Sequence, residues 1–326
     1  MSTSIPPMST QQYLTALNRG IRKHFVDEYK AKRPKLEKLL TVMSQEDFNE
    51  EHMDYTGAGT MQIVPEGTKY PVSTLLEGFK TTYVPQKLGD TIQVTYEVQK
   101  WDKSGLTKAE NIAKAQAKQV TREMERLGSS LFRNGFNTAY TSYGDAKPLF
   151  STSHTRTDGG TAGSNASASG LTLTADNLDE AIIQMREQKD GRGELIETIP
   201  QILLVPPRLM QEALTITKSM QKSGTANNDT NVFKLNEYEG GNLKVIVWDY
   251  LATAAGGSDT AWMLIDPEVA KLNWLWAERP KIGEMDTSNG FLNDTYYWKV
   301  MFYASIGWDD WRGTWASQGN GLTYSS

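Results

Sequence analysis

The strongest structural signal in the chain is a long segment, Leu106–Asn134, which contains no proline and one internal glycine, Gly128. Small and apolar side chains recur there at intervals of three or four residues: Ala113, Ala117, Val120, Met124, Leu127 and Leu131. This spacing is typical of one amphipathic helix, which at 1.5 Å per residue would span about 40 Å. We expect its buried stripe to be Val120, Met124, Leu127 and Leu131. The alanines at its start favour packing on a sheet or another backbone, with a coiled-coil seam as the alternative.

A pattern with period two precedes this helix. Apolar residues alternate with polar ones along Ile92–Val98, which predicts a strand with one buried face. We expect Phe79–Val84 to pair with this strand as an antiparallel hairpin whose turn is Pro85–Asp90. Glycines and prolines break regular structure over residues 57–78. Such a hairpin has too little apolar content to be stable alone, so we expect other subunits to complete it.

Residues 11–53 are predicted to form an arm of helical segments. Apolar residues occur at every fourth position before Pro34 interrupts the pattern, and a second group follows it: Leu36, Leu39, Leu40 and Met43. Charge is segregated, because Arg19–Lys38 holds eight basic and three acidic residues whereas Gln45–Asp54 holds five acids and no Lys or Arg. This indicates a latch onto another subunit or a patch that faces DNA, with a solvated helical face as the equally weighted alternative.

The rest of the chain predicts a mixture of helices and strands. A helix capped by Asp176 or Asn177 would bury Leu178, Ala181, Ile182 and Met185, and a second helix would follow at Arg208–Ser219. Residues 220–231 form a polar loop. The predicted strands are Ile202–Val205, Leu243–Trp248, Ala261–Ile265 and Tyr296–Ala304. The fold class is therefore α+β rather than a repeating βαβ series.

Composition and motifs exclude several functions. The chain of 326 residues has 34 basic and 39 acidic residues, a net charge of −5, which argues against a protein that coats nucleic acid. It has no cysteine, and its three histidines are too far apart for a local metal motif. His154 lies among Ser151, Thr152 and Ser153, but no nucleophile-elbow motif supports a Ser–His pair. No phosphate-binding loop, signal peptide or membrane span is found. We expect no enzyme, cofactor, metal or membrane association.

Tryptophan is concentrated near the C-terminus. Six of the nine tryptophans lie in the last 53 residues: Trp274, Trp276, Trp298, Trp308, Trp311 and Trp315. Clustered tryptophans serve either as a platform for sugars or bases or as a packed core and interface. Because Trp298 falls on one face of an alternating strand, a core or interface role is favoured.

The order of these elements resembles the major capsid protein of tailed bacteriophages, whose shell fold is shared with encapsulins. The segments that carry the resemblance are Lys147–His154, Ile202–Leu209, Val245–Tyr250, Trp262–Pro267 and Gly307–Trp311. Together they cover most of the chain from 57 to 316. The resemblance implies five parts: an N-terminal arm (1–56), an extended β-hairpin loop (57–101), a peripheral domain (102–171) with a spine helix (106–134), an axial domain (172–292) and a return to the peripheral domain (293–326).

The resemblance also implies partners. Subunits would form pentamers and hexamers in an icosahedral shell, in contact with packaged double-stranded DNA and with separate scaffold, portal and decoration proteins. The shell would be the virion capsid, assembled in the cytoplasm of the host bacterium. Candidate interface residues lie on the hairpin and the arm: Phe79, Val84, Pro85 and Lys87, and Arg22, Lys23, Lys30 and Arg33. An encapsulin-like compartment is the alternative within the fold, and a tryptophan-rich carbohydrate-binding or hydrolytic protein is the alternative from another class.

Overall fold

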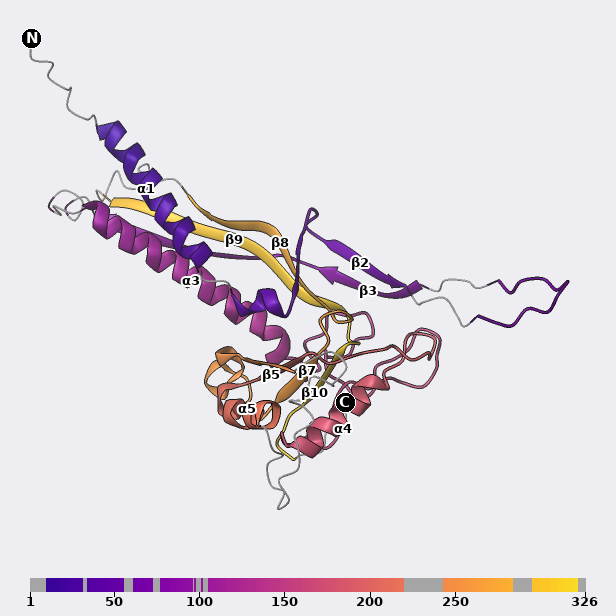
Figure 1. Ribbon diagram of the computed structural model, residues 1–326. Coiled ribbons are helices and arrows are strands. Elements are labelled where there is room, and N and C mark those ends of the chain that lie inside the picture. Colours follow the sequence, from indigo (N-terminus) through magenta and orange to yellow (C-terminus); the bar gives the residue numbers. More distant parts are fainter. Residues whose placement is uncertain are drawn as a thin grey trace, which may run out of the picture. The chain divides into compact units, whose positions relative to one another are not determined.

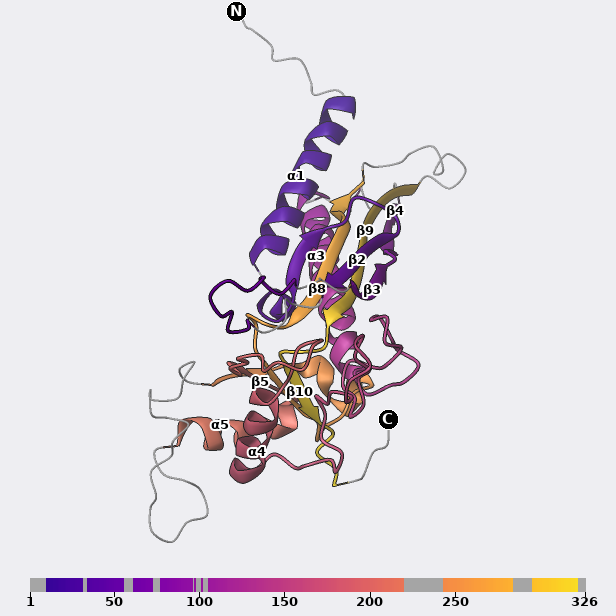
Figure 2. The same ribbon diagram turned by 90° about the vertical axis from the view of Figure 1, so that its right-hand side faces the viewer.

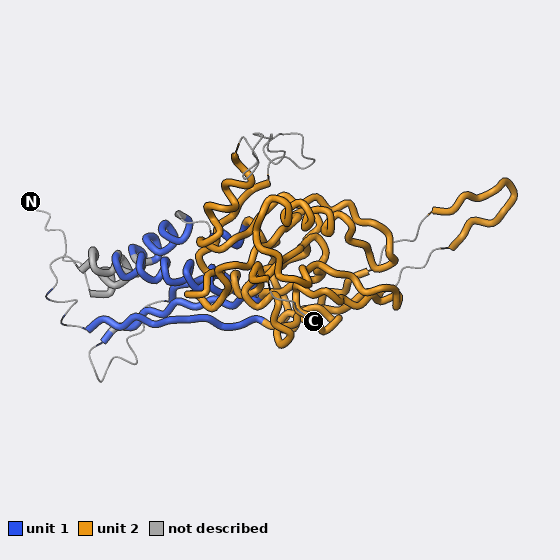
Figure 3. Tube along the Cα trace, turned by 90° about the horizontal axis from the view of Figure 1, so that it is seen from below, with its two compact units in different colours: residues 1–37, 85–126, 275–305 blue, residues 38–84, 127–274, 306–326 orange. Residues whose placement is uncertain are grey.

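The computed structural model describes residues 10–31, 34–55, 61–72, 77–95, 97, 101, 105–219, 243–283 and 295–321. It is an α+β structure whose contacts divide the chain into two compact units (Figure 3). Unit 1 comprises residues 1–37, 85–126 and 275–305, and unit 2 comprises residues 38–84, 127–274 and 306–326. Each unit is therefore assembled from segments that are far apart in sequence.

Unit 1 is built from two helices and a sheet of long strands (Figure 1). The helices are α1 (Thr10–Ala31) and α3 (Gly105–Arg133). Strand β4 (Gln86–Thr95) pairs antiparallel with β9 (Thr295–Asp310) along its whole length. The full strand order is β1-β8-β9-β4, where β1 (Thr41–Ser44) belongs to unit 2 and most of β8 (Lys271–Ile282) belongs to unit 1. On one face of β9 the predicted alternation holds, because Trp298, Val300, Phe302 and Ala304 are all buried.

Helix α3 confirms the predicted long helix to within one residue at each end. Val120, Met124 and Leu131 are buried, whereas Leu127, expected on the same stripe, is only partly buried. A period of 3.6 residues explains the difference, since the buried line runs from Met124 through Gly128 rather than Leu127. Val120 and Phe302 of β9 line one cavity of about 340 Å³, so this face of α3 lies along the sheet.

Unit 2 contains a shorter sheet covered by two helices. Its strand order is β10-β7-β5-β6, with β5 and β6 parallel and the other pairs antiparallel. The strands are β5 (Ile202–Val205), β6 (Lys244–Val247), β7 (Trp262–Ile265) and β10 (Thr314–Ser317). Helices α4 (Ala175–Arg186) and α5 (Met210–Lys218) contribute to one apolar cluster with β5 and β7. Short 3₁₀ helices occupy Lys35–Lys38, Pro207–Leu209, Asp249–Leu251 and Thr253–Ala255.

Helix α4 buries the four residues that its sequence predicted, but its cap differs. The N-cap is Thr174, whose hydroxyl oxygen accepts a hydrogen bond from the backbone N–H of Asn177 at 3.2 Å. Thr174 has extended backbone angles, as an N-cap requires, whereas Asp176 is already in the first helical turn. An acidic residue there is favourable through the helix dipole, which explains why it resembled a cap.

The predicted hairpin is wrong. Strand β3 (Glu77–Tyr83) pairs with β2 (Glu50–Tyr55) and not with β4, which pairs with β9. Pro85–Asp90 is consequently not a turn, since β4 begins at Gln86. The local pairing would have matched at most six residues, whereas the distant strand β9 offers β4 a ten-residue register from Gln86↔Ala304 to Thr95↔Thr295. The longer ladder satisfies more backbone groups.

The arm is helical only in its first part. Beyond α1 the chain forms one 3₁₀ turn and then strands β1 and β2, where a second helical segment was expected. Leu36, Leu39 and Leu40 are nevertheless buried. β-branched Thr41 and Val42 fit a strand better than a helix, which accounts for the change after Leu40. The polar loop predicted at 220–231 lies outside the described residues.

The predicted tryptophan core is confirmed. All six C-terminal tryptophans are buried, with Trp262 and Trp315 packed at 5.1 Å between ring centroids in the apolar cluster of unit 2. In unit 1, Trp276 packs edge-on against Phe302 at 5.8 Å. Within the described ranges, no helix has the length and apolar character needed to cross a membrane.

The stripe of α3 generates a test of the packing. Met124→Asp should lower the free energy of unfolding by about 3–5 kcal/mol, because Met124 is 1% exposed and the new carboxylate would be buried without a partner. Gln119→Asp introduces the same charge at an exposed position of the same helix and should change stability by less than about 0.5 kcal/mol. Urea unfolding of the two variants checks this. Equal losses would show that α3 does not bury this face.

Candidate assembly interface

Strands β2 and β3 form a two-stranded antiparallel sheet, the base of a hairpin whose other described part is residues 61–72. The register runs from Glu50↔Tyr83 to Tyr55↔Glu77, with an irregularity between Met53 and Tyr55. Gly78 is required there, because a Cβ at this position would lie 2.7 Å from the backbone oxygen of Asp54. Burial alternates along β2, so that Glu50, His52 and Asp54 face inward while Met53 and Tyr55 are exposed.

The base of the hairpin is held by Asp309 at the end of β9. Its two carboxylate oxygens accept hydrogen bonds from Tyr83 Oη (2.7 Å) and Asn273 Nδ2 (2.6 Å), and His52 Nδ1 lies 2.8 Å from Oδ2. On its other side, His52 Nε2 is 3.1 Å from a carboxylate oxygen of Glu50. We call these five residues the Asp309 clamp. The clamp joins strands β2, β3, β8 and β9 through side chains.

Burial and charge shift two pKa values in the clamp. Burial alone would lower the pKa of His52, but its hydrogen bonds to Asp309 and Glu50 outweigh that effect and raise the pKa. Burial, reinforced by the negative charge of Asp309, raises the pKa of Tyr83 far above its ordinary value. Tyr83 therefore stays a neutral hydrogen-bond donor, and His52 is stabilised in its charged form.

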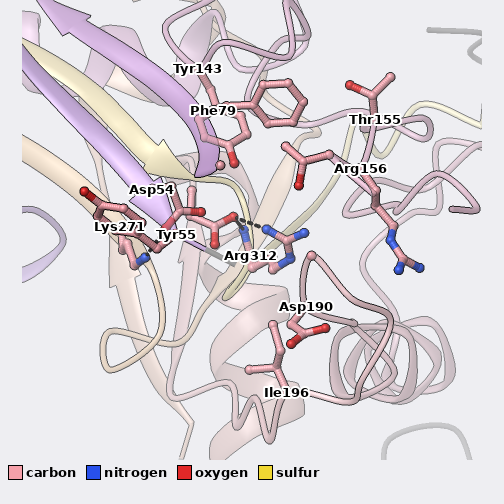
Figure 4. A pocket seen from close by; sticks show the side chains of 14 residues that line it. Asp54, Tyr55, Phe79, Tyr143, Thr155, Arg156, Asp190, Ile196, Lys271 and Arg312 are labelled. Carbon is pink, nitrogen blue, oxygen red and sulfur yellow. Dashed lines mark hydrogen bonds and ion pairs between the residues drawn. The ribbon is translucent and has the colours of Figure 1, made fainter. Parts of the chain in front are cut away.

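A small charged cavity of about 80 Å³ lies beside this base (Figure 4). Lys271 Nζ pairs with Asp54 Oδ1 at 3.0 Å, and Arg312 Nη1 pairs with Asp310 Oδ1 at 3.0 Å. Burial raises the pKa of the Asp310 carboxyl, although Arg312 opposes the shift. These pairs largely neutralise one another, and no group of described residues could hold a metal ion. We therefore interpret the cavity as part of the structure at the base of the hairpin, where two ion pairs line it.

The far part of the hairpin, residues 61–72, has a different character, and we call it the tongue. Its turn is closed by the Thr68 backbone N–H, which donates to the carbonyl of Pro65 at 3.1 Å. Gly67 has φ +75°, which the third position of this turn requires and glycine adopts without strain. On the two limbs the apolar side chains are almost fully exposed: Met61 102%, Ile63 98%, Tyr70 80% and Val72 85%.

The sequence-predicted interface residues of the hairpin are divided by the structure. Pro85 is buried, and the ring of Phe79 packs on Tyr143 at 5.1 Å, so both contribute to the subunit's own packing. Val84 is 50% exposed. Lys87 lies on β4 in unit 1, with its ammonium 5.7 Å from the ring centroid of Tyr303. These residues are thus not brought together at one surface.

Three of the four candidate interface residues of the arm lie at the surface. Arg22, Lys23 and Lys30 are exposed on α1, and Arg33 lies outside the described residues.

Sequence reasoning missed the tongue, since glycines and prolines by themselves indicate only breaks in regular structure. The available signal was the pair of apolar residues spaced two apart on each side of the Pro65–Thr68 turn.

His154 has a structural role. It is fully buried, its Nδ1 lies 2.6 Å from Asp145 Oδ2, and its Nε2 lies 3.1 Å from Asn165 Oδ1. The ring stacks on Trp311 at 4.3 Å with the planes 6° apart. Both ring nitrogens are therefore occupied by oxygen partners, which leaves neither of them for a serine nucleophile.

Comparison with known proteins identifies the family. The model of a family described as phage capsid protein matches residues 78–317. Among solved structures, the capsid of a native GTA particle is similar with a TM-score of 0.53 and 9% identity, over 89% of this chain and 90% of that one. A chain of Gordonia phage Cozz gives a TM-score of 0.51 and 12% identity, over 87% of each chain. No curated protein matches in sequence.

The family match covers well over half of the chain, and the two solved structures share its fold. The chain belongs to the phage capsid protein family and has the phage shell fold. It is a phage capsid protein, a structural protein of the virion.

The Asp309 clamp predicts a pH dependence of stability. Because folding raises the pKa of His52, its contribution is fully present below the unfolded pKa of about 6.5 and is lost as pH rises through the folded pKa. The stability difference between the unaltered protein and His52→Gln should therefore be larger at pH 6 than at pH 9, as measured by urea unfolding. His24→Gln is the control. It leaves the clamp intact, so this variant should keep the pH dependence of stability that His52→Gln loses. A His52→Gln effect that is constant with pH would contradict the clamp.

Proposed function

We propose that this capsid protein self-assembles as pentamers and hexamers into the icosahedral head that encloses packaged double-stranded DNA, and that its tongue binds a neighbouring copy. The observation that carries the proposal is the exposure of four large apolar side chains within one short segment of residues 61–72. Burying each of them against a partner would contribute about 1.5–3 kcal/mol before the costs of association.

A second copy is the partner that the observations favour. A soluble monomer rarely presents such a group of apolar side chains, whereas a shell subunit repeats each contact around closed symmetry. Family membership supplies the second argument, because a capsid protein must bind copies of itself. The similar capsid of the native GTA particle was computed with C5 symmetry.

The proposal assigns roles to the parts of the chain. In this proposal the intersubunit strap is the hairpin that contains β2, β3 and the tongue, rather than the whole of residues 57–101, and α3 is the spine helix of a peripheral domain. Residues 172–292 would form the axial domain at pentamer and hexamer centres, and the last strands would return to the peripheral domain. Assembly would occur in the host cytoplasm, with separate scaffold, portal and decoration proteins. An encapsulin-like compartment would require, in addition, a pocket for a cargo peptide.

Removing the tongue's apolar surface should separate folding from assembly. In the triple variant Met61→Ser, Ile63→Ser and Val72→Ser, the subunit should keep its circular dichroism spectrum and melting temperature, because these side chains are 85–102% exposed. Shells should disappear from negative-stain micrographs, and sedimentation velocity should show small species.

A matched triple variant provides the control. Ile183→Ser, Leu195→Ser and Met210→Ser also remove one Met, one Ile and one other aliphatic residue, all 47–66% exposed, outside the tongue. We expect that variant to form shells. Shells of unchanged stability from the tongue variant would refute the strap, and loss of folding would place the tongue in the subunit's own core.

A further inference from the structure

The helices of unit 1 carry a net positive charge in a protein that is negative overall. The described side chains of α1 (19–30) and of α3 up to residue 126 include eight basic residues: Arg19, Arg22, Lys23, Lys30, Lys114, Lys118, Arg122 and Arg126. The acidic residues in the same segments are Asp27, Glu28, Glu123 and Glu125, so the sum is 8 − 4 = +4, against −5 for the whole chain. We call these eight basic side chains the basic helix layer.

The basic residues of α1 share one face. Arg19, Lys23 and Lys30 follow at i, i+4 and i+11, which places them within a narrow arc of the helix, and all three are exposed. Phe25 lies on the other side and is buried. This face is therefore directed to solvent rather than into the subunit.

The basic residues of α3 form a second row. Lys114, Lys118, Arg122 and Arg126 are four residues apart, about 6 Å for each step and about 18 Å in total. Lys118 and Arg122 are exposed and do not line the cavity between Val120 and the sheet, whereas Arg126 is exposed but also lines that cavity. The middle of the row, Lys118 and Arg122, thus lies on the side of the helix away from this cavity.

The two rows are neighbours. Lys118 Nζ of α3 lies 3.9 Å from Glu28 Oε1 of α1, and the two views of the chain show these helices side by side (Figures 1 and 2). Two of the four acids pair with the layer, Glu28 with Lys118 and Glu123 with Arg126 at 2.8 Å, and Glu125 accepts a hydrogen bond from the backbone N–H of Lys35. Among the described residues, Arg19, Lys23, Lys30 and Arg122 have no ion-pair partner, so positive charge remains available.

The composition of this surface favours a polyanion. Val26, 41% exposed, is the one large apolar side chain exposed among the described side chains of the layer's two segments, whereas a protein partner usually needs an apolar centre. The chain's own acidic segment, residues 46–54, is a poor candidate because three of its five acids are already paired: Glu51 with Lys80, Asp54 with Lys271, and Glu50 with His52.

We propose that the basic helix layer binds the phosphate backbone of duplex DNA, without reading sequence. The inference rests on the proposed function, since a head that encloses DNA presents duplex at high concentration to its inner surface. A few basic contacts give weak, salt-sensitive binding through counterion release. Weak contact is suited to a lining that must hold DNA during packaging and release it later.

The test removes charge from the layer and measures DNA binding. The full-length chain, taken from the fraction that sediments as free subunits, is titrated against a fluorescent 30-base-pair duplex at several salt concentrations. In the triple variant Lys23→Gln, Lys30→Gln and Arg122→Gln, the slope of log K against log salt should become shallower by about 2.7, since each lost contact contributes about 0.9. Binding at low salt should weaken at least tenfold.

A matched control removes the same charge elsewhere. Arg208→Gln, Lys218→Gln and Lys244→Gln are exposed positions of unit 2 and should leave the slope unchanged. Equal losses in both triple variants, or no binding by the unaltered chain, would overturn the proposal. So would binding of a poly-glutamate peptide in preference to the duplex, which would indicate an acidic protein partner.

Shell formation by the same variants, followed by electron microscopy, separates this inference from the proposed function. Shells without DNA binding would refute the inference alone, whereas DNA binding without shells in the unaltered chain would refute the proposed function alone.

Discussion

The carboxylate of Asp309 fixes the base of the extended hairpin. A two-stranded hairpin is marginal in water, so β2 and β3 need an anchor beyond their own ladder. Asp309 supplies it by binding Tyr83, Asn273 and His52, which come from three different strands. Because these groups are largely withdrawn from water, each hydrogen bond is costly to lose. Contacts within the subunit therefore hold the base of the hairpin in place.

The base of this hairpin and the tongue bury and expose opposite kinds of side chain. At its base, polar side chains are buried and satisfied by one another, and the cavity beside them is lined by paired charges. In the tongue, apolar side chains are exposed, with no described part of their own chain covering them. We propose that a subunit built in this way folds by itself and completes the burial of its apolar side chains against a neighbouring copy. That combination is what a self-assembling shell needs, since stability is deferred to contacts between copies.

Local sequence patterns predicted the elements whose buried face is visible as a regular spacing of apolar residues. The long helix, the strand Ile202–Val205 and the buried face of α4 were found because their apolar spacing is visible within one segment. The pairing of β4 was not, since its partner β9 is about two hundred residues away and a nearer strand, β3, competes for it in the sequence. The tryptophan core followed from alternation on β9.

For the proposed interface, the sequence indicated the basic residues of α1 but not the apolar residues of the tongue. Charge is exposed by default, so Lys23 and Lys30 could be placed on a surface without knowing the fold. Met61 and Ile63 are apolar and would be expected to be buried. Only the folded structure shows that they are exposed to solvent. The clamp was invisible as well, because Asp309 meets His52 and Tyr83 only after distant strands are brought together.

The most direct test of the central claim is a cryo-electron microscopy map of particles assembled from this chain, at a resolution that shows side chains. The account predicts that residues 61–72 lie on an adjacent subunit, with Met61, Ile63, Tyr70 and Val72 buried between the two copies. A closed shell in which these side chains still face solvent, or pack on their own subunit, would contradict it.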